Sequence, residues 1–542
     1  MITVSDQFKE AIYAPIRKTA AKVTFEILDN EAYEDNTITV TGEAPISRKS
    51  QLANKVRTMT NRYATFEQDY WKLDGSFYIP PVLGEDNSEL SWWSGAICGS
   101  DGVFDPYQVI EFVFAGEHNS MGLTITFDVL ANEYAADFDI DIYRADDSPV
   151  NHQAVTGNTK TVYALIHGLD NYGKIVITIK KWTNPYRRAR ITEIDFGVIK
   201  NYEGDKLISL NLIEEMAVIG DTIPINELRF TVDNSDKEFN ILNPEGFYRF
   251  FKERQEISLS LGVEIFEGLF EYTDFKKYYL TDWQSDEGAL TATFTARNII
   301  ELLDQREYVP AVTTNLYALA EDILLGAGVM EYYIDPALQA IPTGGFPEKI
   351  SRRKALQCVG IAGKCAVYQD RQGISTIRRF ENLDERTAYV NYAGEDMFCG
   401  MTFPSVIADY GLRNIDFDNA YEIPQIKLDS LVKSLTVVVY SGSERQEFVY
   451  FNAGISEGTS LKLDNPLIQS EAQAADVAGW ILAESNLRAL YSINWRQNPC
   501  LECGDTVLVE DNFGMKKASR IIKQEYNFQG YLVGKTETKG GV

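Results

Sequence analysis

Hydrophobic and polar residues alternate with a period of two along many short segments of this chain. Residues 257–263 (ISLSLGV) and 290–295 (LTATFT) show the pattern clearly, and residues 23–27 and 37–41 repeat it nearer the start. Such alternation is typical of strands with one buried face and one solvated face. The chain is therefore predicted to be mainly β. Segments 23–27 and 37–41 are predicted to pair as a hairpin whose sheet continues at 207–212.

Two turn signals interrupt the segment 228–263. Asp233-Asn-Ser-Asp236 follows a strand-like run, and its side chains can hydrogen-bond to their own backbone. Asn243 precedes Pro244, which moves it out of the helical region. Strand, turn, break and strand together predict a rigid frame and not a catalytic site.

Residues 62–198 have a different composition. They contain four of the seven tryptophans, namely Trp71, Trp92, Trp93 and Trp182. They also contain six short strand candidates, at 109–114, 123–129, 138–143, 161–165, 174–179 and 190–194. Many short strands separated by turn signals are typical of an antiparallel sandwich. We expect this segment to be a β-sandwich inserted into another domain.

Helical periodicity is confined to later segments. Asn298 with Glu301 predicts a capping box, and Ser351 is expected to cap another helix. Between them, residues 315–325 place five apolar side chains on one helical face: Leu316, Leu319, Ala320, Ile323 and Leu324. Asp370-Arg-Gln-Gly373 then predicts a tight hairpin.

The last part of the chain returns to short strands around one helix. Strands are predicted at 434–440, 447–451, 506–510, 519–526 and 531–537. Ser470 is expected to cap the helix, with Gln473 as its box partner.

The chain of 542 residues has a formal net charge of −28, which disfavours binding to DNA and to anionic membranes. The charge serves solubility; alternatively, in a ring-shaped assembly, an acidic lumen would keep passing DNA from adhering. No apolar run reaches the ~18 residues of a membrane span. The first residues lack the apolar core of a signal peptide, so we expect synthesis in a cytoplasm and no membrane insertion.

Three segments carry a resemblance to a known family: VDNSDKEFNILNP (232–244), EISLSLGV (256–263) and YYLTDWQSDEGALTATFTARNIIELL (278–303). They resemble central baseplate hub proteins at the tail tip of bacteriophages, especially phages of Gram-positive hosts. GDTVLVED (504–511) and the strands after it resemble the second barrel of these hubs. Within 62–198, ATFEQDYWKLDGSF, LSWWSGAICGSDGVFDPYQVIEFVF and RITEIDFGVI resemble galactose-binding-like (discoidin-type) jelly rolls, a carbohydrate-binding-module fold.

These resemblances imply a mainly β fold with small α+β parts, in four domains. Residues 1–61 with 199–310 form a first tube-type β-barrel domain, and 62–198 form the inserted antiparallel β-sandwich. Residues 311–383 form a small helix–helix–hairpin module, and 384–542 form a second tube-type β-barrel domain with a helix.

The hub resemblance implies a structural, non-enzymatic protein of a phage tail or a contractile injection particle. It implies a homotrimeric ring that joins the tail tube or distal tail ring proteins to a central spike or tip. DNA would be only passing cargo, and the protein would reside in the virion baseplate after assembly in the host bacterial cytoplasm. Two alternatives remain: a carbohydrate-binding adsorption protein that recognises host cell-wall glycan, and a peptidoglycan or glycan hydrolase.

The aromatic residues of the inserted segment are the candidates for glycan binding. Trp92, Trp93, Tyr107 and Trp71 offer flat faces on which sugar rings stack. If 90–94 is extended, Trp92 and Trp93 point to opposite faces, with one in the core and the other exposed. The alternative is that these aromatics only fill the sandwich core.

Other candidate chemistry is sparse. Asp101 and Asp105 could offer oxygen ligands to Ca²⁺, but they lack EF-hand spacing and also fit an ordinary Asp-Gly turn. Cys500 and Cys503 form the one CxxC motif, without the further ligands that zinc requires. The three histidines (His118, His152 and His167) are expected at the surface or in loops. A hydrolase is supported only by the abundance of carboxylates, and no cofactor is predicted.

Overall fold

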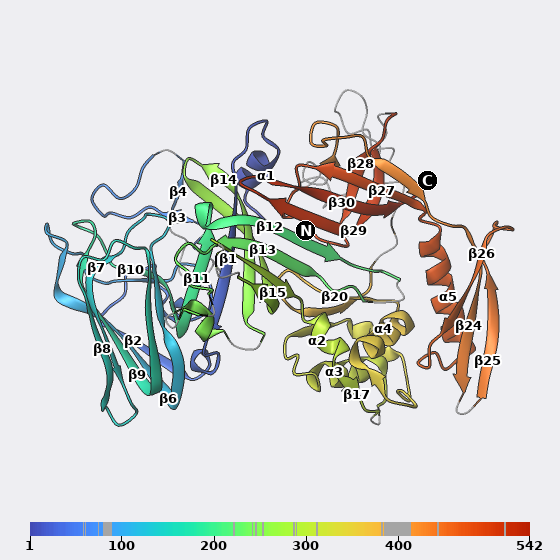
Figure 1. Ribbon diagram of the computed structural model, residues 1–542, viewed down its shortest axis with the longest axis horizontal. Helices are drawn as coiled ribbons and strands as arrows, with labels where there is room; N and C mark the ends of the chain where they lie inside the picture. Colours follow the sequence, from blue (N-terminus) through green and yellow to red (C-terminus); the bar gives the residue numbers. More distant parts are fainter. Residues whose placement is uncertain are drawn as a thin grey trace.

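The computed structural model describes most of the chain (Figure 1). Residues 58, 60, 74, 80–88, 220–222, 241, 244–245, 252–253, 286–287, 289, 311–312, 381–382, 384–413, 442–443, 514–515 and 542 are outside the described part. The predicted start of the second barrel domain at 384 and the Pro244 break therefore lie outside it. The predicted fold class is confirmed, because strands dominate and helices occur only in small α+β parts.

The domain predicted as the first barrel, and called the first barrel from here on, is an antiparallel sheet in the strand order β11-β1-β14-β15-β16-β13-β12. Their bounds are β1 Thr19–Leu28, β11 Gly197–Glu203, β12 Leu207–Glu215, β13 Glu227–Asp233, β14 Glu256–Phe266, β15 Leu269–Gln284 and β16 Thr291–Arg297. The period-two alternation buries one face of each strand around Phe25, Phe230 and Phe294. The short helices η3 (Gly204–Lys206) and η4 (Phe247–Phe250) lie in its connections.

The domain predicted as the second barrel, called the second barrel from here on, continues the same sheet. Its strands are β22 Asn414–Ile415, β23 Gln425–Leu428, β27 Ala489–Trp495, β28 Thr506–Glu510, β29 Lys516–Phe528 and β30 Leu532–Gly540. Pairing between β12 and β29 runs from Leu210↔Phe528 to Glu215↔Lys523. The two barrels thus form one 13-stranded sheet across the centre of the molecule (Figure 1). The N-terminal helix α1 (Asp6–Tyr13) packs against β14.

The inserted sandwich lies at the left of Figure 1 and has its own core. Its seven-stranded sheet contains β2 Asn36–Val40, β5 Trp92–Trp93, β6 Val103–Phe127, β7 Ala135–Tyr143, β8 Pro149–Val155, β9 Val162–Trp182 and β10 Arg190–Asp195. The short elements η1 (Glu31–Tyr33), η2 (Lys49–Gln51), β3 (Arg62–Tyr63) and β4 (Phe77–Tyr78) lie in its loops. Several predicted strands merge into the long, bulged β6 and β9.

The predicted hairpin between 23–27 and 37–41 is wrong. β1 pairs with β11 and β14, whereas β2 pairs with β6 of the sandwich, from Asn36↔Phe114 to Val40↔Ile110. Both segments alternate with period two, so the pattern identified two strands correctly but could not choose their partners. The chain leaves the first barrel directly after β1.

The helical module lies beneath the two barrels (Figure 1). It contains α2 Ile300–Asp304, α3 Leu316–Leu325, α4 Arg352–Gly363, η5 Pro336–Ala340, β17 Glu307–Tyr308, β18 Tyr332–Ile334, β19 Ile350–Ser351, β20 Ala366–Gln369 and β21 Ser375–Arg378. The predicted apolar face of α3 is buried, and Ser351 caps α4 by accepting from Lys354 N–H. The Asn298 cap is wrong: α2 begins after Ile299, without a side-chain cap.

A second small sheet lies at the right of Figure 1. It has the order β25-β24-β26, with bounds β24 Val432–Ser441, β25 Glu444–Phe451 and β26 Thr459–Asp464, and it packs on α5 (Glu471–Ser485). Ser470 caps α5, as predicted. Leu319 of α3, Val359 of α4, Val437 of β24 and Val477 of α5 belong to one core, so this sheet is packed with the helical module. Among the described residues, no helix is both long and apolar enough to cross a bilayer.

Candidate functional site

Trp92 and Trp93 are both buried, at 0% and 2% exposure, so the expectation of one exposed indole is wrong. They do point to different surroundings: Trp92 belongs to the sandwich core, and Trp93 belongs to a small separate cluster with Tyr63 and Leu90. The Trp93 indole N–H donates to the carbonyl of Leu90 (2.8 Å). The two indoles lie on different sides of their strand, as predicted, but a loop covers the side on which Trp93 lies.

Buried charges hold that covering loop in place. Arg190 on β10 pairs with Glu67 of the loop between β3 and β4. Its guanidinium lies 4.0 Å from the ring centroid of Tyr70 and 4.3 Å from that of Trp93. Glu133 accepts from the Trp182 indole N–H at 2.8 Å in the same region. A buried guanidinium needs such partners, so this network fixes the loop over Trp93.

The other two glycan candidates remain accessible. Trp71, in the loop between β3 and β4, is 42% exposed, and Tyr107, on β6, is 48% exposed. The two residues belong to different elements, so no single strand pattern in the sequence predicts that both rings are accessible. Of the four predicted residues, only these two offer an aromatic face to solvent.

The Asp101 carboxylate occupies an ordinary turn, since its Oδ1 accepts from the backbone N–H of Val103 (3.0 Å). Asp105 lies further along on β6. No group of three or more His, Cys, Asp or Glu side chains suited to a metal ion occurs within the described residues. Cys500 and Cys503 are free thiols, and burial raises the pKa of Cys500 to about 12, so it is a poor nucleophile at neutral pH.

Ion pairs fix the inserted sandwich to the first barrel. Arg57 pairs with Glu26 on β1 (3.2 Å) and with Asp195 on β10 (2.8 Å). His118 on β6 contacts Asp29, next to the end of β1, at 3.1 Å. His118 is buried, so its expected place at the surface is wrong. These contacts lie where the chain passes from β1 of the first barrel into the sandwich.

Arg371 joins the helical module to both barrels. It lies at the tip of the β20–β21 hairpin, and its side chain is buried. It pairs with Glu214 on β12 (2.7 Å) and donates to the carbonyl oxygens of Pro499 (2.7 Å) and Leu501 (2.8 Å). Its guanidinium also lies 3.8 Å from the ring centroid of Phe275 on β15. The Arg371 side chain therefore connects the helical module, which carries it, to the first barrel and to the segment before β28 of the second.

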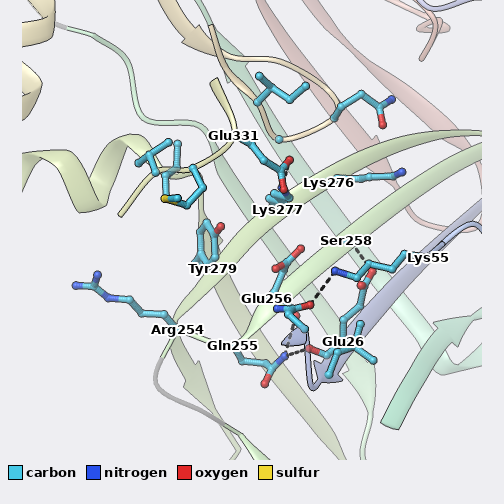
Figure 2. A pocket seen from close by; sticks show the side chains of 18 of the residues that line it. Glu26, Lys55, Arg254, Gln255, Glu256, Ser258, Lys276, Lys277, Tyr279 and Glu331 are labelled. Carbon is cyan, nitrogen blue, oxygen red and sulfur yellow. Dashed lines mark hydrogen bonds and ion pairs between the residues drawn. The ribbon is translucent and has the colours of Figure 1, made fainter. Parts of the chain in front are cut away.

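A cavity of about 700 Å³ opens where the first barrel, the helical module and the segment between β1 and β3 meet (Figure 2). Its lining is mostly charged or polar and includes Glu26, Lys55, Gln255, Glu256, Lys277 and Glu331. The pKa of Glu256 is raised to about 7, first by burial and then by the neighbouring Glu26. Charged groups of both signs favour a polar or ionic occupant over an apolar one.

Sequence reasoning missed both Arg371 and Glu256. Arg371 stands in an Asp-Arg-Gln-Gly turn, which predicts a solvated side chain. Glu256 begins the alternating segment 256–263 on its polar face, which also predicts exposure. The burial of Arg371 and the partial burial of Glu256 arise from elements that are distant in the sequence, and no local signal identifies either.

No family model and no curated protein matches the chain. Among solved structures, the tail protein from Neisseria meningitidis MC58 is 11% identical, with a TM-score of 0.41 over 62% of this chain and 93% of that one. Prophage tail protein gp18 from Listeria monocytogenes EGD-e is 11% identical, with a TM-score of 0.37 over 62% of this chain and 91% of that one.

A third neighbour is chitosan-binding module 1 of a chitosanase/glucanase from Paenibacillus sp. IK-5. It is 13% identical, with a TM-score of 0.20 over 31% of this chain and 96% of that one. The neighbours thus include tail proteins and a carbohydrate-binding module. All three likenesses are distant.

Proposed function

We propose that this chain is a structural, non-enzymatic component of a phage tail or related injection particle. In this role it forms the hub of a baseplate, a homotrimeric ring between the tail tube and a central spike or tip. The observation that carries the proposal is the pairing of β12 with β29, which merges the two barrels into one 13-stranded sheet. A wall built from one sheet transmits load through backbone hydrogen bonds, as a channel segment requires.

The attachment of the other parts supports a mechanical role. Arg371 ties the helical module to both barrels, and Arg57 ties the sandwich to the first barrel. Buried ion pairs need well-matched geometry and resist relative motion of the parts they join. The resemblance of 232–263 and 278–303 to baseplate hubs points to the same class of protein.

Native mass spectrometry with negative-stain imaging of the full chain tests this proposal. The expected result is a ring with three times the 61.2 kDa chain mass. A monomer at micromolar concentration, with no ring on mixing with tail-tube protein, would refute the hub assignment.

Glycan binding by the sandwich is the second candidate. It is favoured by the accessible rings of Trp71 and Tyr107. It is compatible with a hub, because an adsorption module can be attached to a structural ring. Binding of host cell-wall fragments by the full chain, and its loss on changing both rings, distinguishes this candidate from a purely structural insertion.

A further inference from the structure

One short segment carries the chain from the first barrel into the sandwich. It is residues 29–35, called the crossover segment from here on, between the end of β1 and the start of β2. The sandwich strand β6 places His118 against this segment, and the imidazole is buried, at 6% exposure. The contacts of His118 therefore affect how the sandwich is held to the first barrel.

The ring of His118 lies between two carboxylates of the crossover segment. Its Nδ1 lies 3.1 Å from Asp29 Oδ2, and its Nε2 lies 3.0 Å from both carboxylate oxygens of Asp35. A neutral imidazole has one N–H donor and one acceptor nitrogen, so it can donate to only one of the two carboxylates. Its other nitrogen would then direct a lone pair at a carboxylate in a buried site. Only the imidazolium form donates to both aspartates.

The other charged and titratable groups around the ring supply no alternative donor to its nitrogens. Tyr172 on β9 donates its hydroxyl hydrogen to Asp29 Oδ2 (3.4 Å). Burial, followed by the charge of Asp29, raises the pKa of Tyr172, so this hydroxyl keeps its proton and remains a donor. Of the other titratable side chains nearby, Glu31, Glu34, Glu117 and Asp170 are exposed, Tyr33 donates to Asp195, and Lys174 pairs with Asp147.

The two aspartates differ in what holds them when the imidazole is neutral. Asp35 also accepts from the backbone N–H of Gly116 on β6 (3.0 Å), and the chain continues from it into β2, which pairs with β6. Asp29 Oδ1 accepts only within its own segment, from the backbone N–H of Glu31 (3.2 Å). In the described part of the chain, the 3.4 Å bond from Tyr172 would then be the one contact between the Asp29 carboxylate and the sandwich. Loss of the second imidazole proton therefore weakens the hold on Asp29 more than the hold on Asp35.

We propose that His118 is a proton-operated latch between the sandwich and the first barrel. In the imidazolium form it clamps Asp29 and Asp35 and holds the crossover segment against β6. When one ring proton passes to solvent water, the neutral ring keeps its hydrogen bond to Asp35 and releases Asp29. Histidine ordinarily changes its charge between pH 5 and pH 8, so the latch is closed on the acidic side and opens as the pH rises. This inference does not depend on the hub assignment.

Hydrogen exchange of the full chain, measured by mass spectrometry at pH 6.5 and pH 8.5, tests the latch. We expect the protection of the amides of residues 29–35, corrected for intrinsic exchange rates, to fall at least about tenfold from the lower to the higher pH. This factor corresponds to the loss of one charge-assisted hydrogen bond.

Two variants are expected to abolish the pH dependence in opposite ways. His118→Gln has one donor group and one acceptor at every pH, so the crossover segment should exchange fast at both. Asp29→Asn should exchange slowly at both, because an amide N–H can donate to the unprotonated Nδ1 of the neutral ring. His152→Gln is the matched control: His152 is exposed, and its Nδ1 contacts Asp141 (2.6 Å) far from the crossover segment in the sheet. It should change the protection of residues 29–35 by less than about twofold.

Three results would overturn the proposal: protection in the native chain that does not change with pH, native pH dependence in His118→Gln, or native pH dependence in Asp29→Asn. The thermal unfolding of each variant is measured in parallel. If His118→Gln does not fold, the native chain and Asp29→Asn still decide the outcome. The exchange of this segment can be read in a monomer or in a ring, so failure of the latch leaves the proposed function untouched.

Discussion

Replacing Arg371 by alanine tests whether the parts of this molecule are held as one body. The substitution removes the only cation paired with the buried carboxylate of Glu214 within the described residues. It also leaves the carbonyl oxygen of Pro499 without its donor in the described part of the chain, whereas that of Leu501 still accepts from Gln524 Nε2 (2.7 Å) and Tyr526 Oη (3.1 Å).

The magnitude follows from the cost of an unpaired buried charge. Removing one partner of a buried ion pair costs about 3–5 kcal/mol, and the orphaned carbonyl of Pro499 moves the value toward the upper end of that range. Arg371→Met combined with Glu214→Leu removes both charges and fills the space with apolar groups. We expect the double variant to recover at least half of the loss.

The assay is urea unfolding combined with hydrogen exchange of the hairpin amides, because a chain with several cores need not unfold in one step. Faster exchange in 366–378 would locate the loss at the hairpin. Arg378→Ala, at an exposed position on β21, is the control and should change stability by less than about 0.5 kcal/mol.

Glu214 adds a pH signature to this test. Burial raises the pKa of Glu214, and Arg371 opposes that rise, so the pKa should rise further in Arg371→Ala. Protonation then removes the unpaired charge, and the deficit of the variant should shrink as the pH falls. A loss below about 1 kcal/mol at neutral pH, or equal losses in the single and double variants, would refute the role given to Arg371.

Three further predictions concern the sandwich and the cavity. Trp92→Ala and Trp93→Ala should each lower the free energy of unfolding by about 3–5 kcal/mol, because both indoles are buried. A near-normal melting temperature would contradict the core packing of Trp92 in the first variant and the cover of the loop over Trp93 in the second. The folded-state pKa of Glu256 is about 7, above its ordinary value of 4.5, so ionisation costs stability as the pH rises from 4.5 through 7. Glu256→Gln should therefore be more stable than the native chain by about 3 kcal/mol at pH 8 and equal to it at pH 4, measured by urea unfolding. Trp71→Ala and Tyr107→Ala should leave stability within about 0.5 kcal/mol, since both side chains are accessible, and unchanged binding of cell-wall fragments in the double variant would exclude a glycan site at these rings.

Local patterns in the sequence predicted the elements whose cause is local. Period-two alternation identified β14 and β16, and the apolar face of α3 was named residue by residue. Ser351 and Ser470 were recognised as caps, because a serine hydroxyl that accepts from the first turn acts within four residues. The mainly β class and the tight turn ending at Gly373 followed from the same kind of signal.

Only the tertiary structure decided which elements became partners. β2 alternates as β1 does, yet it joins the sandwich, because pairing depends on the faces that distant strands offer and not on the strand itself. Trp93 stands on the outer side of its strand, as its position requires, but the loop carrying Glu67 and Tyr70 covers it. Arg371 and Glu256 have sequences typical of solvated positions, yet Arg371 is buried and Glu256 half-buried where units far apart in the chain meet. Sequence alone predicted strands such as β14 and β16, the helix α3 and the caps at Ser351 and Ser470, because these depend on neighbours within a few residues. Burial and charge pairing depend on the sum of contacts from distant segments, and that sum exists only in the folded chain.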